Sequence, residues 1–153
     1  EGLRENKEAM AETIENNVRR VIIDEMAVNP KYYEKMSELL DALIQQRKQE
    51  AIDYKEYLKR IVALTKRVKA PETQTSYPST VNTPARRAMY DNLGQNAELA
   101  VRLDEAILNV KKADWRGNKF KEKEVRTAIK AVLGGDEGQI ERIFEIVKSQ
   151  RDY

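Results

Sequence analysis

The chain has 153 residues, 41% of them hydrophobic and 35% charged, and its 28 basic and 26 acidic residues leave a net charge of +2. This composition excludes a disordered tail, which has few large apolar residues and a strong charge of one sign, and it excludes a uniformly basic DNA-coating protein. The lack of cysteine excludes disulfides and thiolate metal sites. The lack of histidine excludes Ser-His-Asp and Cys-His catalysis and imidazole ligands.

The first two predicted elements are helices. Apolar residues at steps of three, four or seven predict a helix over 3–26, with one buried stripe formed by Leu3, Met10, Ile14, Val18, Val21 and Ile22. Asn29 is a candidate N-cap, and Pro30 suits a first helical turn, where its missing N–H is not needed. A second helix is therefore expected from Pro30 to about residue 50.

The spacing of Asp53 and Glu56 is that of a capping box and predicts a third helix over 54–69. The alternative is one unbroken helix over 30–69. Residues 70–83 contain two prolines and many Ser and Thr, so we expect a linker or long loop without regular structure.

The remaining chain also has helical spacing. Thr83 and Pro84 begin a short helix that ends at Gly94, a residue suited to a left-handed C-terminal position. Asn96 caps a helix over 97–113, and after a loop at 115–118 come helices over 119–133 and 137–150. The sequence thus predicts an all-α protein, an irregular bundle of six or seven helices in a single helical domain over 1–153.

Motifs for nucleotide or acyl chemistry are missing from the sequence. It has no Gly-Lys dipeptide for a phosphate-binding Walker loop, no GxGxxG pattern and no Gly-x-Ser-x-Gly elbow. The acidic residues mostly alternate with lysines at helical spacing, including Glu122 with Arg126, which is typical of solvated helix faces. No catalytic, cofactor-binding or metal-binding residue is predicted.

The most basic window runs from residue 111 to 130 and surrounds the only tryptophan, Trp115. One interpretation is phosphate contact, with Trp115 stacking on a base. The favoured interpretation is that Trp115 closes a joint between two helices, with Phe120 packed beside it and Gly117 allowing the chain to turn. The candidate contacts to DNA or a partner in this window are Lys111, Lys112, Arg116, Lys119, Lys121, Lys123, Arg126 and Lys130.

Arg86 and Arg87 are two further candidate contacts. They lie in the first turn of the helix after Pro84, where the helix dipole disfavours cations. Such a placement suggests that they hold a carboxylate or a phosphate.

Four stretches, 14–68, 77–93, 103–133 and 143–153, together resemble one family. They are similar, in the expected order and over roughly residues 10 to 153, to the C-terminal helical domain of the restriction (R) subunit of type I restriction-modification enzymes. The resemblance implies a longer parent polypeptide with a nuclease domain and two ATP-driven motor domains, a site-specific deoxyribonuclease that translocates DNA. ATP and magnesium are implied for the parent subunit only.

The resemblance implies a non-catalytic assembly domain that docks the R subunit onto the methyltransferase and specificity subunits, beside the motor domains of its own chain. The alternative is direct, non-specific DNA contact through residues 111–130. The start of the sequence, which has no initiator Met and no leader, suggests a domain excised from that longer chain. No apolar run is long enough to span a membrane, and we expect a cytoplasmic location.

Overall fold

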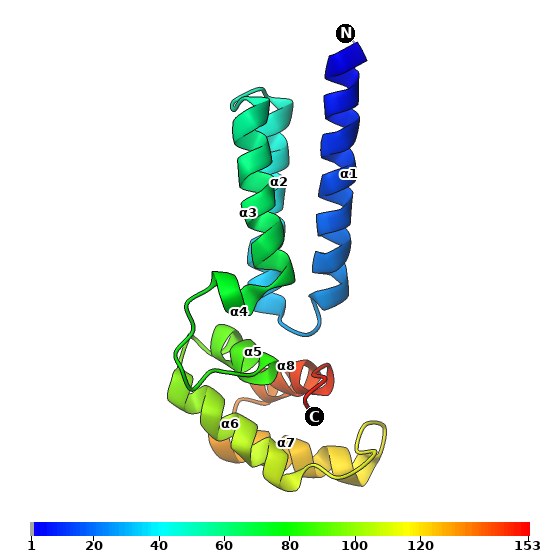
Figure 1. Cartoon of the computed structure of the whole chain (residues 1–153). Coiled ribbons are helices and arrows are strands. Elements are labelled where there is room, and N and C mark those ends of the chain that lie inside the picture. Colours follow the sequence, from blue (N-terminus) through cyan, green and yellow to red (C-terminus); the bar gives the residue numbers. More distant parts are fainter. Residues whose placement is uncertain (1) are drawn as a thin grey trace. The chain divides into compact units, whose positions relative to one another are not determined.

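The structure is a computed structural model that describes residues 2–153, except for the side chain of Gln74. The described residues form eight helices and no strand, so the predicted all-α class is confirmed (Figure 1). The helices are α1 (Gly2–Glu25), α2 (Pro30–Lys48), α3 (Tyr54–Lys69), α4 (Pro71–Gln74), α5 (Pro84–Asn92), α6 (Ala97–Val110), α7 (Lys119–Leu133) and α8 (Glu137–Lys148).

The described chain divides into two compact units, which we call unit 1 and unit 2. Unit 1 comprises the residues up to Met26 together with Tyr33–Ser76, and unit 2 comprises Ala27–Tyr32 and Tyr77–Tyr153. The sequence suggests one helical domain, whereas the helices group around two separate sets of contacts.

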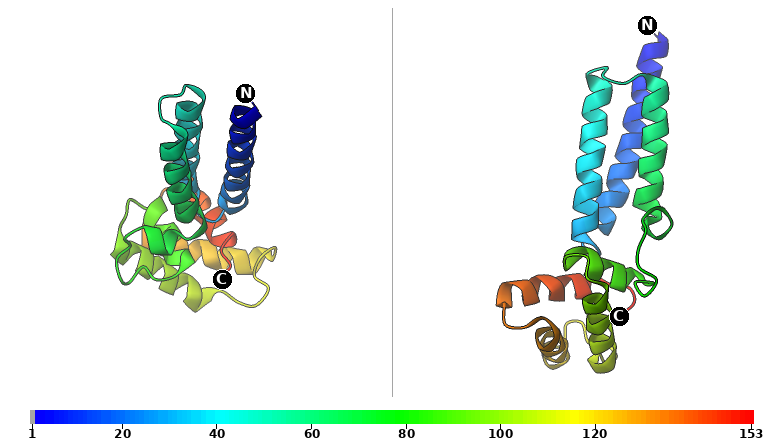
Figure 2. Two further views of the ribbon diagram at one scale, coloured as in Figure 1. Left: turned by 45° about the horizontal axis from the view of Figure 1, so that its top comes forward. Right: turned by 90° about the vertical axis from the view of Figure 1, so that its left-hand side faces the viewer.

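Unit 1 is built from the long helices α1, α2 and α3, with the short α4 following α3 (Figure 2). The sequence left open whether residues 30–69 form one helix or two. The Asp53 carboxylate accepts a hydrogen bond from the Glu56 backbone N–H at 2.7 Å and so caps the start of a separate helix. The chain therefore breaks between α2 and α3. The buried apolar residues of the unit are Ala11, Val18, Ile22, Tyr33, Met36, Leu40, Leu43, Tyr57, Ile61, Leu64 and Val68.

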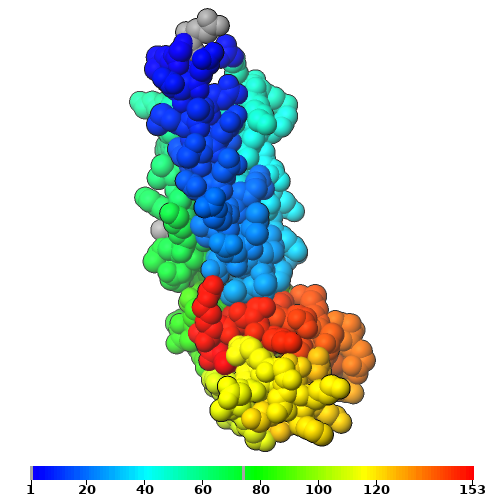
Figure 3. Space-filling view, turned by 90° about the vertical axis from the view of Figure 1, so that its right-hand side faces the viewer, coloured from blue at the N-terminus to red at the C-terminus, as the bar shows by residue number. Residues whose placement is uncertain are grey.

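The predicted buried stripe of α1 is wrong at its N-terminal end. Leu3 is 68% exposed and Met10 is 58% exposed, and the buried face of the helix starts only at Ala11. Figures 1 and 2 show that α1 begins beyond the ends of α2 and α3. Met10 directly precedes the fully buried Ala11 and lies off the buried face of the helix. The space-filling view shows the outer side of these first turns uncovered (Figure 3).

The stretch 70–83 contains more structure than expected. Residues 71–74 form α4, with Pro71 in its first turn, so the expectation of no regular structure is wrong there. This one-turn helix accounts for the eighth helix. Farther along, the Tyr77 hydroxyl donates to Asp91 at 2.6 Å and Val81 is 2% exposed, so the end of the loop is tied to unit 2.

Unit 2 is built from α5, α6, α7 and α8. All four helices begin at side-chain caps: Thr83 accepts from the Arg86 N–H, Asn96 from the Leu99 N–H, Asn118 from the N–H groups of Phe120 and Lys121, and Asp136 from the Gln139 N–H. The predicted left-handed glycine after α5, Gly94, has a φ of 72°. The core cluster of the unit includes Ala85, Ala88, Met89, Ala100, Leu103, Ile107, Trp115, Val125, Ile129, Ile140, Ile143, Phe144, Ile146 and Val147.

Candidate functional site

The predicted basic window, residues 111–130, begins directly after α6 and comprises the following loop and most of α7. Five of its eight cations have partners within unit 2. Lys112 pairs with Glu124 at 2.8 Å, and Lys121 donates to the Ala113 carbonyl at 2.7 Å. Lys111, Lys119 and Lys123 make no hydrogen bond or ion pair through their side chains among the described residues.

Arg116 holds the end of the chain. Its guanidinium donates to the backbone carbonyls of Lys148, Gln150 and Tyr153 at 2.7, 2.6 and 3.2 Å. A guanidinium carries five N–H donors in a fixed fork and can satisfy several carbonyls left open at a helix C-terminus. Arg116 is therefore committed to the fold, although the sequence made it a candidate contact.

Two cations of α7, Arg126 and Lys130, pair with acids of the same unit. Arg126 binds Glu141 of α8 at 3.0 Å and lies 3.8 Å from Glu122, and Lys130 lies 3.5 Å from Glu137. The Arg126 guanidinium also lies 3.9 Å from the ring centroid of Phe144. These contacts link α7 to α8.

Trp115 is 2% exposed, so it is the joint residue that the favoured interpretation predicts. Its ring meets Phe144 edge to face, with centroids 6.0 Å apart, and the Arg116 guanidinium lies over the ring at 4.7 Å. The prediction that Phe120 packs beside Trp115 is wrong, because the Phe120 side chain is 82% exposed. Asn118 caps the start of α7, so Phe120 lies in the first helical turn. Its side chain is open to solvent.

Glu122 is the buried carboxylate of α7, with a side chain 11% exposed, and so does not lie on a solvated face as predicted. The backbone N–H of Gly117 donates to it at 2.7 Å, and the Lys148 ammonium lies 3.4 Å away. The Gly117 hydrogen bond, followed by Lys148 and Arg126, lowers the pKa of Glu122 below its ordinary value. The carboxylate thus fixes the loop after Trp115 to α7.

Arg86 holds a carboxylate, as its position in the first turn suggests. Its guanidinium lies 2.8 Å from Asp104, which is 4% exposed, and it also donates to the Thr80 carbonyl at 2.9 Å. Asp104 accepts a second hydrogen bond from the Tyr153 hydroxyl. Burial, and then the Asp104 carboxylate, raise the pKa of Tyr153. Arg87 instead lies over the ring of Tyr77, 6.0 Å from its centroid.

Unit 1 has a similar buried group that the sequence reasoning missed. Glu15 of α1 is 4% exposed and accepts two hydrogen bonds from Arg47 of α2, at 2.7 and 2.9 Å, and one from the Tyr57 hydroxyl of α3, at 2.8 Å. Burial and the hydrogen bond to Glu15 raise the pKa of Tyr57. One signal was present: Glu15 is spaced by four and three residues from Ala11 and Val18, on the buried face of α1.

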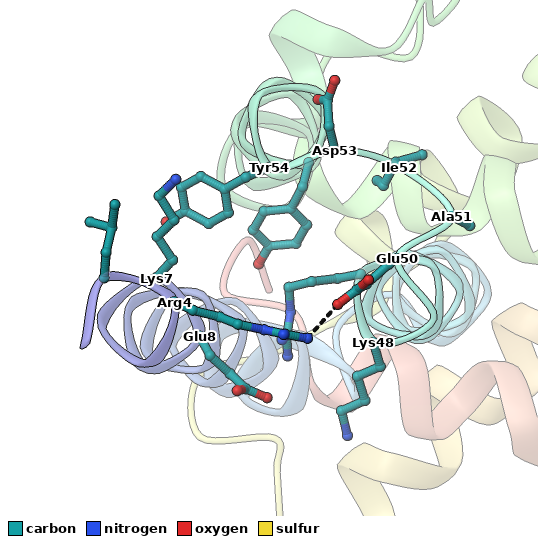
Figure 4. A pocket seen from close by; sticks show the side chains of 12 residues that line it. Arg4, Lys7, Glu8, Lys48, Glu50, Ala51, Ile52, Asp53 and Tyr54 are labelled. Carbon is teal, nitrogen blue, oxygen red and sulfur yellow. Dashed lines mark hydrogen bonds and ion pairs between the residues drawn. The ribbon is translucent and has the colours of Figure 1, made fainter. Parts of the chain in front are cut away.

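A pocket of about 670 Å³ lies next to this group, between the first turns of α1 and the loop that joins α2 to α3 (Figure 4). Arg4 forms an ion pair with Glu50 across it, and the Lys7 ammonium lies 5.1 Å from the centroid of the Tyr54 ring. Tyr54 stacks on Tyr57 with centroids 6.1 Å apart. The pocket therefore combines aromatic surface with charges of both signs.

Within residues 2–153, no cluster of three or more acidic residues has the geometry to hold a metal ion. In the same range no helix has both the length and the apolar character needed to cross a membrane. Comparison with family models, curated proteins and solved structures finds no match to this chain. The similarity to type I R subunits stays a prediction from the sequence stretches named above.

Proposed function

We propose that the chain is a non-catalytic helical assembly domain of the kind found at the C-terminus of type I restriction R subunits. In this role it docks an ATP-dependent DNA translocase and endonuclease subunit onto the methyltransferase–specificity core. The proposal is supported by the length and order of the sequence resemblance, together with the all-helical fold. The parent's motor and nuclease activities belong to other parts of that polypeptide.

The observation that carries the docking role is the exposure of Phe120. At 82% it is the most exposed large apolar side chain in the described chain. Aromatic residues are enriched in protein–protein interfaces, and a few anchors of this type provide most of the binding energy. Phe120 lies between Lys119 and Lys121, so a partner with an apolar recess and an acidic rim fits it best.

Direct DNA contact through residues 111–130 is the weaker candidate. Five of the eight cations there are held by carboxylates or backbone carbonyls of unit 2. Binding to phosphate would require these cations to exchange their existing contacts, so their contribution to affinity would be small.

The direct test is capture of the 153-residue chain on an immobilised methyltransferase–specificity core, with and without DNA. We expect retention in both conditions, and we expect Phe120→Ala to weaken it by at least about tenfold, because truncation of an anchor costs more than about 1.4 kcal/mol. Val62→Ala, which truncates a residue 52% exposed in unit 1, is the matched control and should bind normally.

Failure of the unmodified chain to bind the core would overturn the proposed function. Normal binding of Phe120→Ala would overturn the assignment of the anchor. A second test removes the corresponding segment from the parent subunit, which should keep its ATPase activity and lose co-purification with the methyltransferase.

A further inference from the structure

A row of lysines follows the outer side of α3, a helix that carries six basic residues and one acidic residue in the sequence YKEYLKRIVALTKRVK. Lys55, Lys59, Lys66 and Lys69 are all exposed. At 3.6 residues per turn they fall within a stripe about 80° wide and about 21 Å long. The buried face, Tyr57, Ile61, Leu64 and Val68, lies on the opposite side of the helix. We call these four lysines the α3 lysine row.

The α3 lysine row has no acidic counterpart. None of its four ammonium groups makes a hydrogen bond or ion pair among the described residues, and the one carboxylate of α3, Glu56, pairs with Arg60 at 3.1 Å. The shallow hollow in the middle of the row is lined by Leu58, Lys59, Val62, Ala63 and Lys66, without an acid. The row thus differs from α7, where Arg126 and Lys130 pair with acids and Lys121 donates to a backbone carbonyl.

Local helix energetics explain only the C-terminal half of the row, because Lys66 and Lys69 lie in the last turn, where the helix dipole favours cations. Like charges at i,i+4, as at Lys55 and Lys59, destabilise a helix, and Lys55 lies in the first turn, where the helix dipole disfavours a cation. A helix that only needed solubility would alternate acids and bases on this side. The N-terminal half of the row is therefore unfavourable for the isolated helix, and the row as a whole is favourable for a long anionic partner.

We propose that the α3 lysine row binds the phosphate backbone of duplex nucleic acid without reading its sequence. Lysine is a point charge that suits phosphate, and contacts to phosphate position a protein without carrying sequence information. Protein interfaces are depleted in lysine, and membrane-surface helices present large apolar or aromatic residues beside their cations. The row offers only Val62, 52% exposed, as a large apolar side chain.

This inference does not depend on the proposed docking role. The docking role rests on Phe120 in unit 2 and on a protein partner, whereas the α3 lysine row lies in unit 1 and its partner is a polyanion. A chain that fails to bind the methyltransferase core could still bind duplex, and a chain that binds the core could fail with duplex.

The experiment measures binding of the full chain to a fluorescent 30-base-pair DNA of mixed sequence by anisotropy, from 50 to 200 mM salt. Four phosphate contacts predict a slope of log K against log salt of about −3.6, which is an affinity loss of about 150-fold over this range. The variant Lys55→Gln, Lys59→Gln, Lys66→Gln should bind more weakly and keep a slope of only about −0.9. Glutamine has a helix propensity close to that of lysine, so circular dichroism should be unchanged.

The matched control is Lys111→Gln, Lys119→Gln, Lys123→Gln, which removes the same charge from the unpaired lysines of unit 2. It should keep the affinity and slope of the unmodified chain. Equal losses in the two triple variants, or no loss in the α3 variant, would overturn the proposal. Tighter binding to phosphatidylserine vesicles or to poly-glutamate than to the duplex would also overturn it, because the row would then serve a membrane or an acidic protein.

Discussion

Unit 1 and unit 2 each bury one carboxylate between an arginine and a tyrosine hydroxyl, but they surround it differently. Glu15 in unit 1 joins three helices and lies in a core without tryptophan or phenylalanine. Asp104 in unit 2 lies in a core that also contains Trp115 and Phe144. The difference indicates that unit 1 depends more on its polar group, whereas unit 2 depends more on aromatic packing.

The largest expected effect tests the aromatic packing of unit 2. Trp115→Ala should lower the free energy of unfolding by about 4 kcal/mol, because it removes a large buried side chain and leaves a cavity beside Phe144. Hydrogen exchange of α7 and α8 measures the loss locally. Phe120→Ala, whose ring is exposed, is the control and should stay within about 0.5 kcal/mol. Similar losses in both variants would contradict the assignment of Trp115 as the joint.

The next effect tests the polar group of unit 1. Arg47→Ala should lower the free energy of unfolding by about 3 kcal/mol, because Glu15 would remain buried without its cation. Hydrogen exchange of α1, α2 and α3 gives the readout. Arg19→Ala breaks the exposed pair with Asp41 between α1 and α2 and should cost at most about 1 kcal/mol. If the two variants lost equal stability, Glu15 would not be the centre of unit 1.

The smallest expected effect is a pH dependence of the stability of unit 2, caused by Glu122. The pKa of Glu122 is lower in the folded chain than its ordinary 4.5, so the unfolded chain binds the proton more readily. Its contribution to stability is therefore present above pH 4.5 and is lost as the pH falls from there through the lower folded pKa. Urea unfolding followed by Trp115 fluorescence should show this loss.

Glu122→Gln should show a flatter stability profile in that acid range. Glu105→Gln, which changes an exposed side chain of the same unit, should keep the profile of the unmodified chain. A Glu122→Gln profile as steep as that of the unmodified chain would show that Gly117 and Lys148 do not favour the charged form.

Local signals in the sequence predicted the helices well. Asp53, Thr83 and Asn96 each act as a cap through a side-chain oxygen, and such caps depend only on neighbouring residues. The short α4 was missed because its single turn leaves no periodic pattern. The exposure of the first turns of α1 was missed because periodicity marks an apolar face and does not show where neighbouring helices end.

The roles of the charged side chains could be predicted only in part. Arg86 holds a carboxylate as expected, but its partner Asp104 is 18 residues away and only the fold brings the two together. Arg116 looked like a surface cation because its acceptors are backbone carbonyls more than 30 residues later in the chain. The α3 lysine row was visible in the sequence as lysines on one side of a helix, but its lack of acidic partners needed the structure.

Five of the eight cations of residues 111–130 hold unit 2 together, whereas the α3 lysine row is available to bind a polyanion. The most direct measurement is an amide NMR titration of the full chain with the 30-base-pair duplex at 50 mM salt. We expect the amide shifts to concentrate at residues 55–69 and to leave 111–130 nearly unchanged. Shifts concentrated at 111–130, with α3 unaffected, would contradict it.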